Sequence, residues 1–218
     1  MFDLLATVDV AAVVAGFVLG VQHGLGPDHC AALATLLWDE RSVARTIQKS
    51  VHFGLGHAAT LGLFTLGAAV LGATIPEAFE RLAEVFGGLL LIALGARVLR
   101  HGAGLPPHDG APHEPPHRHG PRVGLAGAAF ALSGVRGLLL SLPGLLLASR
   151  AWPGVVLFVL AFGLGVTVSM TTFGLVMSYL AAKGRRRFPL RPGSAWPSRL
   201  LGGSTVALGL TWISLSVA

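Results

Sequence analysis

Charged residues are scarce in this chain. They make up only 12% of its 218 residues, whereas 53% are hydrophobic and 30 are glycine. A water-soluble domain carries about a quarter of its residues as charged side chains. The shortage therefore excludes an ordinary soluble globule and indicates a protein that crosses a lipid bilayer several times.

Cysteine is almost absent, since Cys30 is the only one. A lone cysteine excludes an intramolecular disulfide and the usual cysteine-based zinc sites. The amino-terminal residues 1–20 also lack the basic region and the cleavage site of a secretory signal peptide. We expect this segment to be retained and to lead into the first helix.

Long apolar stretches are abundant, and six of them are near or above the roughly 20 residues that a helix needs to cross a bilayer. They cover residues 9–37, 51–74, 79–99, 123–148, 153–181 and 200–217. The third is the weakest, because Glu80, Arg81 and Glu84 lie in its first turns. The pattern predicts an all-α integral membrane protein with about six transmembrane helices in one polytopic domain, residues 1–218.

Basic residues fall mainly in the segments that follow the first, third and fifth apolar stretches. Thirteen of the 16 Lys and Arg residues lie there, two lie in the opposite connections, and Arg136 lies inside the fourth stretch. Positively charged connections stay in the cytoplasm. We therefore expect a multi-pass protein of a bacterial-type cytoplasmic membrane, with both termini outside, a basic cytoplasmic loop at 183–199 and no nucleic-acid partner.

The segment 101–122 differs from the rest, with six prolines, five histidines and no apolar periodicity. It is predicted to be a disordered cytoplasmic loop. Its histidines either gather metal ions or are incidental to a proline-rich spacer, and the sequence favours neither.

A short repeat links two distant apolar stretches. Phe-Gly-Leu-Gly occurs at 53–56 and again at 162–165, and each copy has a further phenylalanine eleven residues after its first one, Phe64 and Phe173. Three crossings separate the copies, so they run in opposite directions. This predicts two inverted three-helix repeats, a plan found in many secondary transporters with a binding site near the membrane midplane.

Ionisable side chains at membrane depth are costly and suggest function. His23, Asp28 and His29 occur within the first apolar stretch, yet a straight helix would point them in different directions. Between the two histidines, Gly26-Pro27 should interrupt the helix, because the proline ring clashes with a preceding carbonyl and lacks an N–H. A break there would let the three side chains converge around one metal ion; the alternative is a polar cluster that joins helices.

Two imidazoles and a carboxylate suit nickel, cobalt, zinc or copper better than magnesium or calcium. His57 is a further candidate ligand in the second stretch. Counted from the cytoplasmic side, His57 and His29 both lie about 10 to 12 Å deep, so they can meet.

These motifs resemble the nickel/cobalt transporter family. His23-Gly24-Leu25-Gly26-Pro27-Asp28-His29 matches its H-x4-D-H pattern, and Leu55-Gly56-His57-Ala58 is similar to its second signature. Phe162-Gly163-Leu164-Gly165 with Ser169 and Met170 is similar to a later motif of the six-helix branch that includes urease-associated nickel transporters. The resemblance implies movement of Ni²⁺ or Co²⁺ across the cytoplasmic membrane, with His23, Asp28, His29 and His57 essential to it.

Four more residues are weaker candidates for the metal site: His52, Cys30, Ser169 and Met170. His52 lies at the membrane edge, where an imidazole can face water. Cys30 is better explained as a small residue for close helix packing, and Ser169 and Met170 as a helix hydrogen bond and a core side chain.

We expect a transporter rather than an enzyme, with Ni²⁺ or Co²⁺ as its substrate, no permanently bound cofactor, and proton exchange coupled to metal movement. Candidate partners are the bilayer and a cytoplasmic metallochaperone or accessory protein. Two alternatives stay open, a membrane-embedded metalloenzyme with histidine ligands and a metal sensor or accessory membrane protein.

Overall fold

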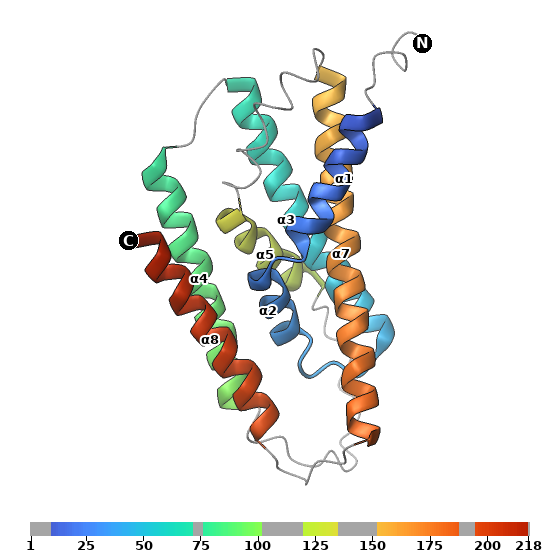
Figure 1. Ribbon diagram of the computed structural model, residues 1–218, viewed down its shortest axis with the longest axis vertical. Helices are drawn as coiled ribbons and strands as arrows, with labels where there is room; N and C mark the ends of the chain where they lie inside the picture. Colours follow the sequence, from blue (N-terminus) through green and yellow to red (C-terminus); the bar gives the residue numbers. More distant parts are fainter. Residues whose placement is uncertain (1–9, 72–75, 102–119, 135–151, 188–194, 218) are drawn as a thin grey trace.

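The computed structural model describes residues 10–71, 76–101, 120–134, 152–187 and 195–217, and every regular element in these ranges is helical (Figure 1). The helices are α1 (Val10–Gly24), α2 (Pro27–Leu36), α3 (Val43–Leu71), α4 (Glu77–His101), α5 (Gly120–Ala131), the 3-10 helix η1 (Leu132–Gly134), α7 (Trp152–Arg187) and α8 (Trp196–Val217). The all-α prediction is therefore confirmed for the described residues.

Three of these helices, α4, α7 and α8, are long and apolar enough to cross a membrane, and the bent pair α1 and α2 makes a fourth span if it counts as one. They match the predicted third, fifth, sixth and first stretches. The predicted second stretch lies mostly within α3, which has 29 residues. The fourth, 123–148, is described only as far as residue 134, and Arg136 lies outside the described residues.

The predicted break in the first span is present. α1 ends at Gly24 and α2 begins at Pro27, with a bend of 61° between them. The N–H of Gly26 donates to the His23 carbonyl at 3.0 Å, which closes α1 in a tight turn. Pro27 is the first residue of α2, a position where its missing N–H costs no helical hydrogen bond.

Helix packing depends on glycines that allow close backbone contact. Gly16, Gly20 and Gly24 form the buried face of α1, four residues apart, and α1 packs against α7. A Cβ at Gly20 would collide with the Phe162 carbonyl, and one at Gly127 of α5 with the Phe53 carbonyl of α3. Small residues at this spacing are typical of helix contacts in membranes.

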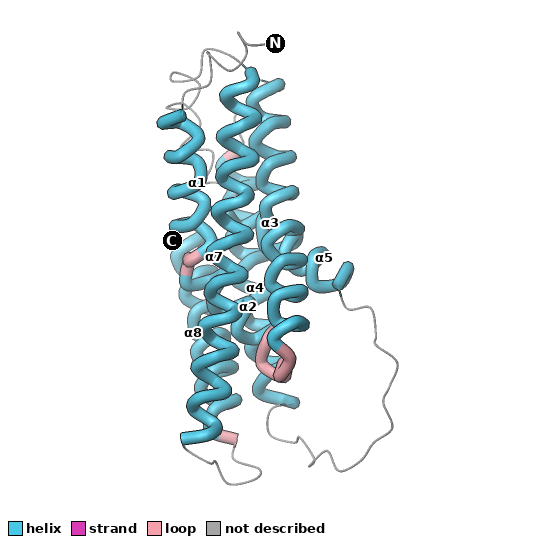
Figure 2. The backbone as a smooth tube through the Cα atoms, turned by 90° about the vertical axis from the view of Figure 1, so that its right-hand side faces the viewer, coloured by secondary structure: helices cyan, strands magenta, loops and turns pink. Residues whose placement is uncertain are grey.

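The helices form two groups, and the short helices α2 and η1 contact members of both groups. α4 packs along α8, whereas α1, α3, α5 and α7 pack against one another in the pairs α1 with α7, α3 with α7, and α3 with α5. α2 contacts α4, α7 and α8, and η1 contacts α4 (Figures 1 and 2). The break in the first span therefore lies in the interior, where both groups meet.

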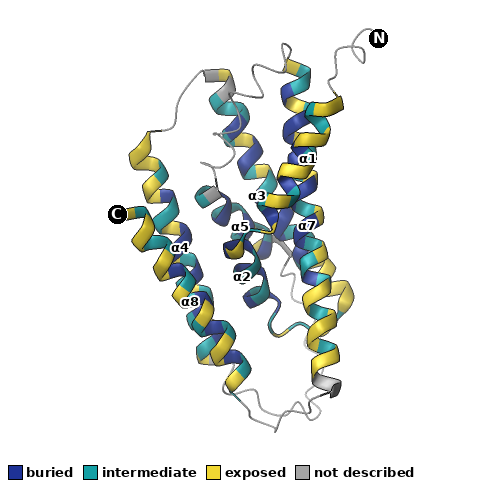
Figure 3. Cartoon of the chain, viewed as in Figure 1, coloured by how far each residue is buried: buried dark blue, intermediate teal, exposed yellow. Residues whose placement is uncertain are grey.

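Exposed residues occur along most of the helices (Figure 3). Large apolar side chains are among them, including Val10, Leu63, Leu160 and Leu215. Such outward apolar surface suits contact with lipid chains rather than with water. Together with the apolar helices it supports a multi-pass membrane protein.

Both predicted loops are shorter than expected, because helices extend into each of them from both sides. α7 continues to Arg187, so the first residues of the predicted basic loop 183–199 are helical, as are those from Trp196. α4 includes His101 and α5 begins at Gly120, which shortens the predicted loop 101–122 at both ends. Apolar segments set the minimum length of a helix that spans a membrane, and polar helical turns can extend beyond it. The other loop histidines lie outside the described residues.

Candidate metal centre

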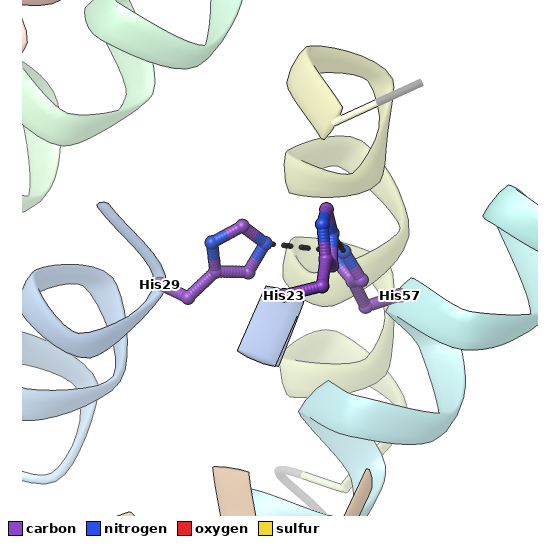
Figure 4. Close-up of side chains that lie close together, drawn as sticks. All are labelled: His23, His29 and His57. Atoms are coloured by element: carbon purple, nitrogen blue, oxygen red, sulfur yellow. Dashed lines mark hydrogen bonds between the residues drawn. The ribbon is translucent and has the colours of Figure 1, made fainter. Parts of the chain in front are cut away.

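Three histidines from three helical segments meet at the break in the first span. His23 lies in the last turn of α1, His29 in the first turn of α2, and His57 in α3 (Figure 4). His29 and His57 are buried, and His23 is partly buried. His23 and His29 come from the same predicted span, and the bend between α1 and α2 brings their rings together, with centroids 4.8 Å apart.

The three rings converge through their Nε2 atoms. His57 Nε2 lies 3.2 Å from His23 Nε2 and also 3.2 Å from His29 Nε2. One ligand atom from each histidine can be chosen so that all three lie within 4.8 Å of one another. Two nitrogens bound at about 2.0–2.1 Å to one ion are about 2.9–3.4 Å apart at right or tetrahedral angles. The two short separations thus already match a shared ion.

Asp28 lies behind His29 rather than among the three Nε2 atoms. The His29 Nδ1–H donates to Asp28 Oδ1 at 2.7 Å, and both side chains are buried. This hydrogen bond fixes the tautomer in which His29 Nε2 carries its lone pair toward the other histidines. The four predicted site residues therefore lie together. The imidazoles of His23, His29 and His57 face one another, and the Asp28 carboxylate is hydrogen-bonded to the opposite side of the His29 ring.

Gly26 leaves the space that this arrangement needs. A Cβ at position 26 would lie 2.7 Å from Asp28 Oδ1 and 3.0 Å from His29 Nδ1. Any larger side chain would have to push the carboxylate and the imidazole apart. The glycine before Pro27 therefore serves the site as well as the turn.

Each histidine ring also has a phenylalanine next to it. The ring centroids of His23 and Phe162 are 5.4 Å apart, those of His29 and Phe130 are 5.5 Å apart, and those of His57 and Phe53 are 6.4 Å apart. All three phenylalanines are buried. They exclude water from the sides of the cluster and limit rotation of the imidazoles.

The weaker candidates do not join the cluster. His52 Nδ1–H donates to the Gln48 carbonyl of its own helix at 2.7 Å, and the Cys30 thiol contacts the Leu25 carbonyl at 3.6 Å. The Ser169 hydroxyl donates to the Val166 carbonyl at 2.9 Å. Met170 is buried in the hydrophobic core. Among the described residues, the group that can hold a metal ion consists of His23, His29 and His57.

Sequence reasoning missed the part that Phe130 and Gly26 play beside the histidines. Phe130 carries no polar atom and comes from α5, so nothing in its local sequence connects it to the motif. The repeated Phe-Gly-Leu-Gly was a usable signal for Phe53 and Phe162, because both copies bring their first phenylalanine to this place.

A search of protein-family models finds no match to the chain, and no solved structure matches it. One curated protein is 28% identical over 168 residues, which cover 72% of this chain and 72% of that protein. It is the urease accessory protein UreH of Bacillus sp. (strain TB-90).

The comparison with UreH supports part of what the sequence predicts. UreH is named for an accessory role to an enzyme. The similarity therefore agrees with the expectation that this chain is not an enzyme, and with a distant relationship to proteins of the urease system.

Proposed function

We propose that the protein is a transporter that carries Ni²⁺ or Co²⁺ across the cytoplasmic membrane. The observation that carries this proposal is the convergence of three imidazoles, from α1, α2 and α3, inside a bundle of apolar helices. Ionisable groups in such a place are kept for the passage or binding of ions.

The ligand set fits a transported transition metal. Neutral imidazole suits nickel, cobalt, copper and zinc, and Cys30, whose thiol would favour a softer ion, is not part of the group. We assign His23, His29 and His57 as ligands and Asp28 as the residue that orients His29. Three protein ligands leave further positions for water, so that the ion is held firmly enough to enter and weakly enough to leave.

Two resemblances support nickel or cobalt as the substrate. The H-x4-D-H pattern from His23 to His29 is that of the nickel/cobalt transporter family, whose six-helix branch includes urease-associated nickel transporters. The similarity to UreH, a urease accessory protein, points to the same branch.

We further propose that the chain has six spans in two inverted repeats. Under this arrangement α1 corresponds to α5, α3 to α7 and α4 to α8. Support comes from paired contacts: Gly20 meets the Phe162 carbonyl as Gly127 meets that of Phe53, and Phe53 and Phe162 open the two copies of Phe-Gly-Leu-Gly. In addition, α1 packs on α7 and α5 packs on α3, so that in each case the first helix of one repeat contacts the second helix of the other.

The proposed orientation has the basic connections in the cytoplasm and both termini outside. In Figure 1 the lower end of the molecule contains the end of α4, the end of α7 and the start of α8. These helix ends adjoin the connections in which Lys and Arg are concentrated. Positively charged segments at one end of the bundle favour that end as the cytoplasmic one.

The direct test is nickel binding and nickel flux by the purified protein and two histidine variants. His57→Ala should lower Ni²⁺ affinity by more than the about 10- to 100-fold expected from losing a residue that only orients a ligand, since it removes the ligand that contacts both other histidines. His52→Ala is the matched control, because His52 lies in the same helix and bonds to its own backbone. Calorimetry measures the affinity, and nickel uptake into proteoliposomes measures transport.

Equal affinities for the two variants would remove the histidine cluster from the proposal. Binding without flux in the unsubstituted protein would instead identify a sensor or an accessory subunit.

A further inference from the structure

Buried polar atoms without a hydrogen-bond partner are concentrated on one helix. Within the described part of the chain they are Thr46 Oγ1, Ser50 Oγ and His57 Nδ1, and all three belong to α3. Each of these side chains is 0% exposed. Such atoms are rare in folded proteins, and a group of them in one helix calls for a physical explanation.

The three side chains follow one face of α3. Thr46 and Ser50 are four residues apart, and Ser50 and His57 are seven residues apart. At these spacings the members of each pair are offset around the helix axis by only about 40° and about 20°, so the three side chains lie almost in a line. At about 1.5 Å per residue, Ser50 is about 10 Å from His57 along the axis, and Thr46 is about 6 Å further. The line begins at a proposed metal ligand and reaches the first turn of α3.

Hydroxyl groups in other helices of this protein do not behave in this way. Those of Thr35, Ser169 and Thr205 donate to carbonyls three or four residues earlier. This is how a serine or threonine inside a helix usually satisfies its hydrogen-bonding capacity. Thr46 and Ser50 leave that option unused, so their hydroxyls are available to water or to an ion that carries water.

In the described part of the chain, the unpartnered polar atoms of α3 lie on one side of the histidine cluster only. On the other side of His57 the same face of α3 continues with Leu61, which is buried, and Phe64, which packs on the hydrophobic core. Near Ser50 the facing residue of α7 is Gly174, where a Cβ would collide with the Ser50 hydroxyl. Thr65, beyond His57, is buried as well, but it is not among the buried atoms without a hydrogen-bond partner. Among the described residues, such atoms in α3 therefore occur only from His57 toward the start of the helix.

We propose that this face of α3, with Ser50 and Thr46, is a hydrated path for the divalent cation between the histidine cluster and the end of the molecule where α3 begins. The inference rests on the proposed transport function. Hydroxyl groups both donate and accept hydrogen bonds, so they can contact the water shell of a passing ion in either orientation. As hard neutral oxygens they bind Ni²⁺ less well than imidazole, which suits passage rather than retention.

Thiol labelling tests the path without depending on transport. Ser50→Cys and Leu55→Cys are placed separately in the full chain in proteoliposomes and treated with a membrane-impermeant, cationic methanethiosulfonate. Leu55 is the control because it lies on the exposed face of the same helix, which faces lipid. Peptide mass spectrometry scores the reaction at each position and separates it from any reaction of Cys30.

Ser50→Cys should react at least about tenfold faster than Leu55→Cys, since no water reaches the lipid side of a helix at this depth. Saturating Ni²⁺ should slow the reaction at Ser50→Cys. Reaction no faster than at Leu55→Cys overturns the path, even if the unsubstituted protein binds and transports nickel. Labelling as expected in a protein that moves no nickel would leave the hydrated path and remove the transport function.

Removal of the hydroxyls gives a second readout that does not need a cysteine. Ser50→Ala and Thr46→Val should each slow nickel flux about two- to tenfold, the loss expected for one hydrogen bond, with Ni²⁺ affinity unchanged in detergent. Thr46→Ser keeps a hydroxyl and should transport normally. Flux at the unsubstituted rate together with a raised unfolding temperature would mean that these hydroxyls are simply buried, and would overturn the proposal.

Discussion

Asp28 and His29 act together at the scale of single residues. The carboxylate accepts the His29 Nδ1–H at 2.7 Å and so directs His29 Nε2 toward His23 and His57. A carboxylate in this position also makes the imidazole more basic and strengthens its bond to a metal ion. The effect of Asp28 on a bound ion is therefore exerted through His29.

Asp28→Asn should lower Ni²⁺ affinity by about 10- to 100-fold, because the amide keeps the size of the side chain but loses the charge behind His29. Isothermal titration of the purified protein measures the change. Asp39→Asn, in the exposed connection after α2, is the control and should leave the affinity unchanged. An Asp28→Asn variant with normal affinity would contradict the assigned role.

The sequence allowed the main residues of the site to be predicted, but not their arrangement. Equal depth in neighbouring spans predicted that His57 and His29 could meet. The position of Asp28 behind His29 could not be predicted, because it depends on the direction in which α2 leaves the break. Nor could the contact of Phe130 with His29, since it comes from packing between helices that are far apart in the chain.

At the scale of helices, close approach depends on glycine. Gly20→Ala should destabilise the protein by about 1–3 kcal/mol, because the added methyl group meets the Phe162 backbone, which cannot rotate away. Gly203→Ala in α8 is the control, since a Cβ there has nothing within 4 Å. Thermal unfolding in detergent measures both. A Gly20→Ala variant as stable as Gly203→Ala would show that α1 and α7 are not packed as described.

Glu40 anchors the connection between α2 and α3. Its carboxylate accepts from the N–H groups of Arg41 and Ser42 at 3.1 Å each and pairs with Lys49 Nζ at 2.9 Å. Burial raises the pKa of Glu40, but the hydrogen bonds from Lys49 and Ser42 and the charges of Lys49 and Arg45 lower it by more, so the pKa of Glu40 lies below its usual range.

A lowered pKa means that Glu40 stabilises the fold when ionised. Its contribution is fully present above the ordinary glutamate pKa of about 4.3 and is lost as the pH falls through the lower folded value. Glu40→Gln should therefore lower the unfolding temperature at pH 7, and the difference from the unsubstituted protein should shrink toward pH 3. A difference that stays constant over this range would mean that the charge of Glu40 does not matter.

The break in the first span was predictable and its geometry was not. Gly26-Pro27 inside an apolar stretch predicts an interruption, because proline cannot continue the hydrogen-bond ladder of a helix. Whether the chain then loops or starts a new helix depends on what it packs against. Here α2 begins at once and contacts α4, α7 and α8, which sets the bend at 61°.

At the scale of the whole molecule, the long apolar stretches predicted the approximate place of the helices. The described residues contain three helices and a bent pair that can span a membrane, in agreement with four of the six predicted spans. Helix ends were predicted less well, because polar turns such as Lys183 to Arg187 extend beyond the lipid-facing part of α7.

The predicted proton coupling would act on the whole of the proposed transport cycle. Imidazoles bind a metal ion only when neutral, so acid on the receiving side should favour release. Nickel flux into proteoliposomes should therefore be faster when the receiving side is more acidic than when the pH is equal on both sides, at the same nickel gradient. Identical initial rates under the two conditions would show that protons take no part.

The bend at Gly26-Pro27 separates His29 from the two long helices that contain His23 and His57. His23 and His57 belong to longer helices that are packed against α7, whereas His29 lies in α2, a helix of ten residues that begins just after the bend. A small tilt of this segment would take one donor away and leave the other two in place. Under the proposed transport function, binding and release of the ion would then require a movement of α2 alone, and the surrounding helices could stay packed.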